Sequence, residues 1–453
     1  MALKALRIGA GAGYAGDRIP PAVALAEKGQ LDYLVFECLA ERTIALAQLE
    51  KIQNPLRGFD PLLSARMKAV LPACMAHGTR IITNMGAANP LQAGKEVLAV
   101  AKALGLHQLK VAVVLGDNVL DILQTQYLAE PLMDSTHTVS DIQALLVSAN
   151  AYLGAEALLP ALQSDAHVII SGRVADPALF LAPLMYHFQW RADDWPLLGK
   201  GVMMGHLLEC AAQITGGYFA DPGYKDVPNL AQLGYPLAEV SANGDVVITK
   251  LADAGGCVTV QTCTEQLLYE IEDPTQYLQP DVVADFSKVK LLQVGPDRVQ
   301  AEGASGSTRP DSLKVTLGYR DGFVGEGQMS YAGPGAQAKG QLALDLVRAR
   351  LADAGYGHFE ARYDLIGVNA ILGNTMPSHE PAEVRARIAV RVTTQAEAQY
   401  VANEVEALYT NGPASGGGAS KSVREVIAAT AMLMPRSAIQ TQTILLDSTA
   451  ELA

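Results

Sequence analysis

The sequence is poor in cysteine and contains no long uninterrupted apolar run. Its five cysteines are odd in number and form no C-x-x-C pair, which is typical of reduced thiols that mostly fill the core of a cytosolic protein. No segment reaches the roughly 18 consecutive apolar residues of a membrane-spanning helix. The first residues, MALKALRIGAG, lack the apolar stretch of a signal peptide and read as the start of a strand. We therefore expect a cytoplasmic protein that does not enter a membrane.

Positive charge is also scarce. The chain has 34 lysine and arginine residues against 47 aspartate and glutamate residues, which gives a formal net charge of -13. Such a balance repels phosphate backbones and anionic lipids, and no dense cluster of lysine and arginine offsets it locally. We therefore expect no nucleic-acid partner.

Apolar residues, in contrast, are abundant. Hydrophobic residues make up 49% of the sequence and charged residues 18%, which is enough apolar surface to bury a large interior. A chain of 453 residues is too long for one small core and predicts two or three packed units. We expect an α/β core domain over residues 1–215, a β-rich insertion or second unit over 216–335, and a C-terminal α+β unit over 336–453.

Apolar runs alternate with helical patterns in the first unit. The runs show no internal alternation of polar and apolar residues, which favours an α/β fold with a mostly parallel sheet flanked by helices. The predicted strands are Leu6–Ile8, Tyr33–Cys38, Arg80–Asn84, Lys110–Leu115 and His167–Ser171, and the predicted helices are Ala22–Lys28, Arg42–Ile52, Leu62–His77, Leu91–Leu104 and Ile142–Leu159.

The pattern changes after residue 216. Turn signals there separate short β-branched runs such as Val246–Thr249 and Val258–Thr262, which indicates strands. The tail then predicts a helix at Gly340–Ala354, strands at Asp364–Ile371 and Arg387–Val392, helices at Ala396–Leu408 and Val423–Met434, and a strand at Ile439–Leu446.

A glycine loop follows the first predicted strand. Gly11, Gly13 and Gly16 fit the pattern G-x-G-x-x-G, and Glu37 ends the next strand about 20 residues later, where the ribose-binding acid of a dinucleotide site would lie. The pair Pro20-Pro21 argues against that site, because proline is tolerated only in the first turn of a helix.

The helix after this loop should therefore begin at about Ile19 or Pro20, with Asp17 as its cap. An aspartate at that place would face an incoming pyrophosphate. We favour a role for Gly11 and Gly13 in the close approach of a substrate or of backbone.

Polar residues follow two further strands. Asn84 and Asn89 lie in the loop after one strand, and Asp117 and Asn118 lie in the loop after the next. In doubly wound sheets, ligands bind beyond the carboxyl ends of the strands, so we expect these loops and the glycine loop to form one rim. The structural alternative is that these side chains only cap helices and close turns. The predicted crevice favours a function for Asp117.

Arg173 is the best candidate for holding a carboxylate. It lies in the segment Ser-Gly-Arg-Val-Ala-Asp after another predicted strand, and its planar guanidinium can bond both carboxylate oxygens at once. The alternative is an internal ion pair between Arg173 and Asp176 at the start of a helix.

His206 and Glu209 are three residues apart and would share a helix face, with Cys210 beside them. An imidazole with a neighbouring carboxylate can serve general acid–base chemistry, although a buried structural histidine is an alternative. A metal site needs more ligands than this pair supplies, and we assign none. No positive partner is evident that would make Cys210 a nucleophile.

Several segments together resemble the acyclic terpene utilisation family, and the resemblance runs over nearly the whole chain. They are Gly9–Pro20, Tyr33–Thr43, Thr83–Pro90, Gly172–Asp176, Gly205–Cys210, Gly216–Phe219, Gln266–Ile271, Asp281-Val282 and Asn411–Gly418. The resemblance implies a place in the catabolism of branched carboxylates that travel as acyl-CoA thioesters, often with a small companion polypeptide. Asn118, where a second acid is expected, and Ser415, within the glycine run, depart from the family pattern.

These observations predict a lyase or hydratase that acts on a branched carboxylate or its thioester. Arg173 would anchor the carboxylate, His206 with Glu209 would move the proton, and the rim with Asp117 would position the acyl group. The alternatives are a non-catalytic scaffold that acts with a small companion, and a nicotinamide-dependent oxidoreductase that uses the glycine loop. We expect a homo-oligomer, and the sequence requires no cofactor beyond a CoA group carried by the substrate.

Overall fold

The computed structural model describes residues 5–133, 135–373 and 380–447. The chain divides into two compact units, one made of Met1–Gly318 with Ala429–Ala453 and the other of Tyr319–Ala428. Of the helices in the described ranges, none is long and apolar enough to cross a membrane.

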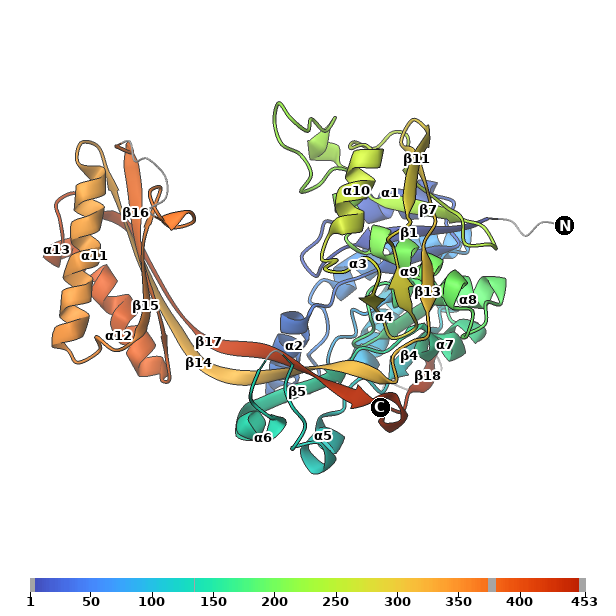
Figure 1. Ribbon diagram of the computed structural model, residues 1–453, viewed down its shortest axis with the longest axis horizontal. Helices are drawn as coiled ribbons and strands as arrows, with labels where there is room; N and C mark the ends of the chain where they lie inside the picture. The colour runs from blue at the N-terminus through green and yellow to red at the C-terminus, as the bar shows by residue number, and fades with distance from the viewer. Residues whose placement is uncertain (1–4, 134, 374–379, 448–453) are drawn as a thin grey trace. The chain divides into compact units, whose positions relative to one another are not determined.

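A ten-stranded sheet forms the centre of the first unit (Figure 1). Its middle strands run parallel, each beside the next, because their apolar runs can be buried on both faces. They are β1 (Leu6–Ala12), β2 (Tyr33–Phe36), β3 (Arg80–Thr83), β6 (Val168–Ser171) and β4 (Val111–Leu115). The predicted α/β class is confirmed.

Antiparallel strands extend this parallel centre at both edges. On the β1 side lie β7 (Pro236–Val240), β8 (Val246–Lys250), β12 (Arg298–Glu302) and β11 (Lys290–Gly295), and on the β4 side lies β18 (Gln442–Leu446). The sheet as a whole is therefore mixed, and only its centre has the parallel arrangement that the first 215 residues predict.

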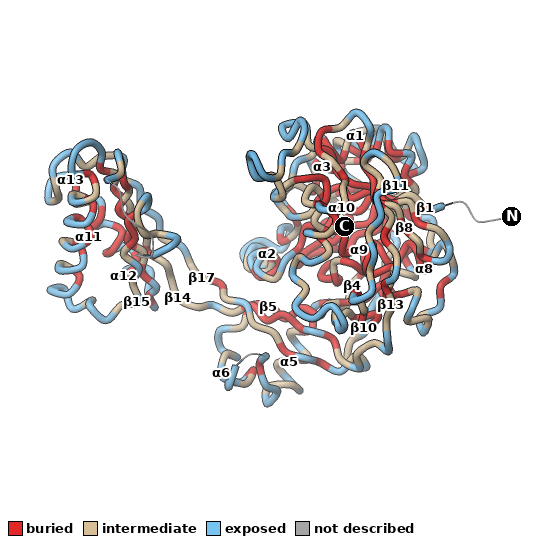
Figure 2. Tube along the Cα trace, turned by 45° about the horizontal axis from the view of Figure 1, so that its top comes forward, coloured by how far each residue is buried: buried red, intermediate tan, exposed pale blue. Residues whose placement is uncertain are grey.

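Helices cover both faces of the sheet. The chain steps in one direction from β1 to β4 and then returns to β6, so right-handed crossovers place the connecting helices on opposite faces. One group is α1 (Pro20–Lys28), α3 (Leu63–His77) and α4 (Pro90–Ala103), and the other is α7 (Leu159–Gln163), α8 (Ala178–Phe188) and α9 (Trp195–Glu209). Figure 2 shows that the strands between them are buried.

The middle region of the sequence is largely continuous with this sheet. Its strand β7 pairs with β1, and a separate small sheet joins β13 (Ser305–Ser307), β10 (Val283–Asp285) and β9 (Tyr277–Leu278). The two units are thus bounded differently from the three-part division expected at residues 215 and 335, because strand pairing binds residues far apart in the chain.

Two secondary-structure predictions in the first unit are wrong. The segment Ile142–Leu159, expected as one helix, contains the strand β5 (Leu146–Ala151), which pairs with β14 (Ser312–Ala332). The run Val258–Thr262, expected as a strand, leads into helix α10 (Val260–Leu268), whose N-cap Thr259 accepts a hydrogen bond from the amide of Thr262. The remaining helices here are α2 (Glu41–Gln53), α5 (Leu120–Gln126) and α6 (Val139–Ile142).

The second unit, Tyr319–Ala428, contains both helices and strands. Its sheet has the order β15 (Glu360–Ile366), β16 (Glu383–Val392), β14 and β17 (Gly417–Pro435). Helices α11 (Ala336–Asp353) and α12 (Gln395–Glu406) pack on β16 around a core of their own, and the short helix α13 (Leu408–Asn411) follows. The helix predicted at Val423–Met434 is wrong, because these residues belong to β17 and its pairing with β14 overrides their helical pattern.

Candidate functional site

A cavity of about 600 Å³ lies in the first unit, beyond the carboxyl ends of three parallel strands. Gly13 follows β1, Glu37 follows β2, and Arg173 follows β6, and all three line it. The carboxyl ends of parallel strands are where doubly wound folds bind their ligands. The apolar part of the wall is made of Leu39, Ala40, Met133, Ala175, Pro177, Leu278, Pro280, Pro310, Leu313 and Leu433.

Arg173 is the positive group of the buried wall. It is 2% exposed, and its Nη2 donates to Oδ1 of Asp176 at 2.7 Å. The guanidinium lies over the ring of Tyr152, 4.0 Å from the ring centroid, so the ring face stabilises the cation. The internal ion pair that the sequence offers as the alternative role of Arg173 is therefore present. The side chain also lines the cavity, as a carboxylate-binding role would require.

The hydrogen bonding of Arg173 is nevertheless incomplete. Within the described part of the chain, its Nε and Nη1 are buried without a hydrogen-bond partner, and so is Oε2 of Glu209, which lines the same cavity. Buried polar groups are nearly always paired, and a charged one left partly unpaired lowers stability. Within the described part of the chain, two residues that line this cavity thus keep buried polar atoms without a partner.

Asp117 fixes the backbone of Arg173. Its Oδ2 accepts hydrogen bonds from the amide of Arg173 at 2.9 Å and from Nδ2 of Asn150 at 2.8 Å. Asp117 is buried, but the cavity lining does not include it. The structure therefore brings Asp117 to the site as a support for Arg173 and keeps it behind the loop.

Glu37 and Asn84 form a second buried pair. Oε1 of Glu37 accepts from the amide of Leu39 at 2.8 Å and from Nδ2 of Asn84 at 2.9 Å. Burial, with the nearby Asp176 as a lesser cause, raises the pKa of Glu37 to about 8 against the opposing effect of Arg173. Asn84 thus holds a carboxyl group that lines the cavity, and it lies behind that group.

His206 and Glu209 share a proton at the end of α9. Nδ1 of His206 lies 2.9 Å from Oε1 of Glu209, and its Nε2 lies 3.3 Å from the carbonyl oxygen of Leu267. Because a carbonyl only accepts, we assign the ring proton to Nε2, which leaves Nδ1 as an acceptor. Burial lowers the pKa of His206 to about 4 and raises the pKa of Glu209 well above its usual range, so the shared proton resides on Glu209.

Of His206 and Glu209, only Glu209 lines the cavity. His206 is 1% exposed and packs against the rings of Tyr277 and Phe286, whereas Glu209 lines the cavity. Contact with a ligand therefore falls to Glu209, and His206 holds it from behind. Cys210, the next residue, also lines the cavity, and burial raises the pKa of its thiol, which disfavours a thiolate.

Three other predicted residues have structural contacts. Nδ2 of Asn89 donates to the carbonyl oxygens of Pro55 and Arg57, each at 2.8 Å, and Asn118 is exposed with its Oδ1 3.1 Å from the amide of Leu120. A Cβ added to Gly11 would lie 2.6 Å from the ring of Phe36. The cavity lining includes none of the three.

Gly13 allows two segments to approach closely. A Cβ at this position would lie 2.5 Å from the carbonyl carbon of Cys210, so a larger residue would push the glycine loop away from the end of α9. Gly13 therefore serves the close approach of backbone that the sequence favours, and it lines the cavity as well.

The carboxylate of Asp17 accepts hydrogen bonds from backbone amides of the glycine loop itself. Oδ2 of Asp17 accepts from the amide of Gly13 at 2.9 Å, where a dinucleotide phosphate would be bound. Helix α1 begins at Pro20, as predicted, but its N-cap is Ile19 and has no side-chain cap, so the assignment of Asp17 as the cap is wrong. Asp17 instead bonds the loop amides of Gly13 and Arg18.

Glu41, Tyr152 and Tyr277 are among the lining residues that sequence reasoning missed. Glu41 accepts a hydrogen bond from the hydroxyl of Tyr152. Tyr152 follows β5, in the segment that the sequence presents as a helix, so its position near Arg173 could not be derived. A recognised strand at Leu146–Ala151 would have been the signal.

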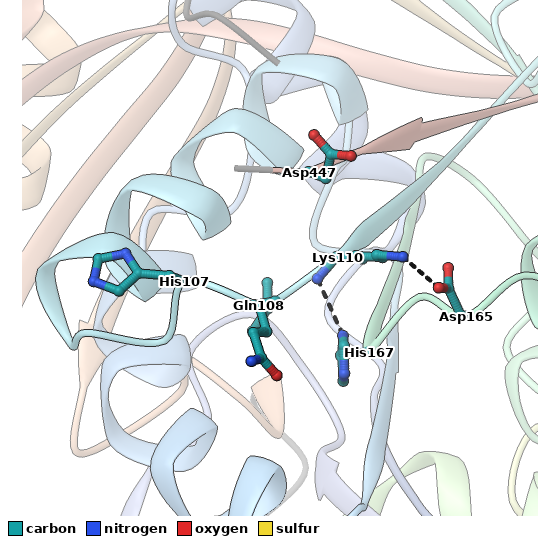
Figure 3. Close-up of a pocket in the computed structure, with 7 residues that line it drawn as sticks. His107, Gln108, Lys110, Asp165, His167 and Asp447 are labelled. Atoms are coloured by element: carbon teal, nitrogen blue, oxygen red, sulfur yellow. Dashed lines mark hydrogen bonds and ion pairs between the residues drawn. The ribbon is translucent and has the colours of Figure 1, made fainter. Parts of the chain in front are cut away.

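A second hollow, of about 480 Å³, lies at the amino ends of the parallel strands, whereas the first cavity lies at their carboxyl ends (Figure 3). Lys110 and His167, which precede the parallel strands β4 and β6, line it, and Nδ1 of His167 accepts from the amide of Lys110 at 3.1 Å. His107 is exposed, and the side chain of Asp165 is 66% exposed. This hollow lacks the buried unpaired donors of the first cavity. The described residues also contain no group of three or more histidine, cysteine, aspartate or glutamate side chains that could hold a metal ion.

Comparison with known proteins gives one match over nearly the whole chain. A family model described as "Acyclic terpene utilisation family protein AtuA" matches residues 6–445. No curated protein matches the chain. Among solved structures, a homoserine dehydrogenase from Thiobacillus denitrificans aligns with 11% identity over 89% of this chain and 83% of that chain, at a TM-score of 0.14. That score is too low to carry a structural argument.

The support that Asp117 gives to Arg173 predicts a loss of stability in Asp117→Ala. The change would leave the amide of Arg173 and Nδ2 of Asn150 buried without an acceptor, so we expect the free energy of unfolding to fall by about 1–3 kcal/mol. Urea denaturation measures this. The control is Asp121→Ala, at an exposed position in α5, for which we expect a change below about 1 kcal/mol. Equal losses in the two variants would contradict the supporting role.

Proposed function

The chain belongs to the acyclic terpene utilisation family AtuA, and from this premise we propose that it is an enzyme acting on a branched small carboxylate or its acyl-CoA thioester. The family description supports a place in acyclic terpene utilisation. The reaction class that fits the cavity best is that of a lyase or hydratase.

The observation that carries this proposal is the incomplete hydrogen bonding of the Arg173 guanidinium among the described residues. Two nitrogens of Arg173, Nε and Nη1, have no partner among the described residues, and each is a charged donor that an oxygen of a carboxylate can accept from. Asp176 occupies the third nitrogen and holds the fork in place. A ligand carboxylate, or a thioester carbonyl oxygen, would complete the hydrogen bonding of the buried cation.

The rest of the cavity supports an apolar acyl group. Leu39, Leu278, Leu313 and Leu433 contribute to its wall, and a volume of about 600 Å³ falls within the range of small-molecule sites. A branched hydrocarbon chain would bury against these side chains while its polar end meets Arg173.

Glu209 is the group we propose for proton transfer. Its Oε2 is an unpaired acceptor beside the cavity, and its Oε1 bonds to His206. A proton taken from the ligand by Oε2 can be matched by movement of the Oε1 proton to Nδ1 of His206. Because burial lowers the pKa of His206 to about 4, the imidazolium returns its proton to Glu209 when Oε2 gives a proton back to the ligand. Addition or loss of water beside a carbonyl needs such a proton acceptor together with a donor that stabilises the oxygen, here Arg173.

Removal of the guanidinium is the test of ligand binding. We expect Arg173→Lys and Arg173→Met to weaken the binding of 3-methylbutanoate by about 10-fold or more, since each loses the guanidinium donors that a carboxylate accepts from. Isothermal titration calorimetry measures the affinity. Arg191→Met is the matched control, because Arg191 is an exposed arginine that pairs with Asp193. Unchanged binding in both Arg173 variants would refute this site.

Solvent exchange tests the chemistry. The wild-type protein should incorporate deuterium from D₂O into 3-methylbut-2-enoyl-CoA, and Glu209→Gln should do so about 10²–10⁴-fold more slowly while it still binds the thioester. Mass spectrometry of the recovered thioester gives the rate. Binding without any exchange by the wild-type protein would favour the alternative of a non-catalytic binding subunit.

A further inference from the structure

We propose that Glu37 is a carboxylic acid in the working protein and that its Oε2 donates a hydrogen bond to an oxygen of the anion held by Arg173. This inference deepens the proposed function and rests on it for the identity of the anion. It adds to Arg173 a second, uncharged donor in the same cavity.

The hydrogen bonds of Glu37 decide where its proton can lie. Oε1 receives two donors, the amide of Leu39 at 2.8 Å and Nδ2 of Asn84 at 2.9 Å. The amide of Asn84 is oriented in turn, because its Oδ1 accepts from the amide of Cys38 at 2.8 Å. A proton on Oε1 would displace one of these donors. It therefore belongs on Oε2, the oxygen available to the cavity that Glu37 lines.

The surroundings keep this carboxyl neutral. Glu37 is 7% exposed, and burial is the main cause that raises its pKa to about 8, with Asp176 adding to the rise. Arg173 and the two donors on Oε1 act in the opposite direction but do not cancel the burial. At pH 7 the acid form therefore prevails.

Several elements contribute the other titratable groups of the cavity. Glu209 and Cys210 come from the end of α9, Glu270 and Tyr269 follow α10, Tyr277 belongs to β9, and Glu41 begins α2. Tyr152 and Lys314 lie beside Glu41. Three of these groups are carboxyl groups and one is a lysine, so an ionised Glu37 would add negative charge to a wall that must receive an anion.

The chemical consequence is that the cavity binds an anion more tightly below the pKa of Glu37 than above it. Asp176 is paired to Arg173 and Glu41 to Lys314, so an anionic ligand meets cations whose charge is already partly balanced. A neutral Glu37 offers this ligand a hydrogen bond, whereas an ionised Glu37 would repel it. Anion binding should therefore weaken as the pH rises through about 8.

Carbon-13 NMR of protein labelled at the glutamate δ-carbon tests the protonation state directly. The signal of Glu37 is the one lost in Glu37→Gln and kept in the control Glu27→Gln, which changes an exposed glutamate of α1. We expect this signal to titrate with a midpoint near pH 8. A midpoint near the ordinary glutamate value of about 4.3 would overturn the proposal.

A second variant covers the case in which Glu37→Gln does not fold. Asn84→Ala removes a donor that favours the ionised form, so the same signal should then titrate at a still higher pH. If no glutamate signal of the wild-type protein titrates above pH 7, the proposal is also overturned, whatever the variants do.

Binding of 3-methylbutanoate tests the role of the acid. Wild-type affinity should fall by about tenfold for each pH unit above the pKa of Glu37, because the competent acid form is depleted by that factor. Glu37→Gln, whose amide can still donate, should bind with similar affinity at pH 7 and show no such fall. Tighter binding by Glu37→Gln at pH 7 would show that Glu37 is ionised and repels the anion. If the wild-type protein binds no carboxylate, the proposed function fails, and the NMR titration still decides the state of Glu37.

Discussion

The constraint on which the site depends is a buried guanidinium group, that of Arg173, two of whose three nitrogens have no partner among the residues that the structure describes. Burying a cation is costly by several kcal/mol unless it is well paired. The protein offsets part of this cost through Asp176, through the ring of Tyr152, and through Asp117, which holds the backbone of Arg173. The hydrogen bonding that remains open is of the kind that an anionic ligand completes.

The parallel centre of the fold could be predicted because its strands are buried on both faces and therefore appear as continuous apolar runs. The strands β5 and β17 could not, because their residues show helical patterns and become strands only through pairing with β14, which is distant in the sequence from β5. The same long-range pairing explains the unit boundaries. Pairing between β7 and β1 joins the middle of the chain to the first sheet, and no local signal indicates that contact.

The candidate site, like the fold, could be predicted only in part from the sequence. A strand followed by a polar loop was enough to select Arg173, Asp117 and Asn84, but sequence alone could not separate residues that line the cavity from those behind it. His206 shows the difference, because its ring lies behind Glu209 and only the carboxyl group reaches the cavity. Glu37 and Glu209 differ in the partner that fixes one carboxyl oxygen. For Glu37 it is the amide of Leu39, and for Glu209 it is the ring of His206, so we propose different roles for the two groups.

A crystal structure of the protein grown with 3-methylbutanoate tests the central claim most directly. The account predicts the carboxylate in the cavity with an oxygen within hydrogen-bonding distance of Nε or Nη1 of Arg173, and its branched end against the leucine side chains of the wall. An anion bound elsewhere, with Arg173 still lacking partners at both nitrogens, would contradict it.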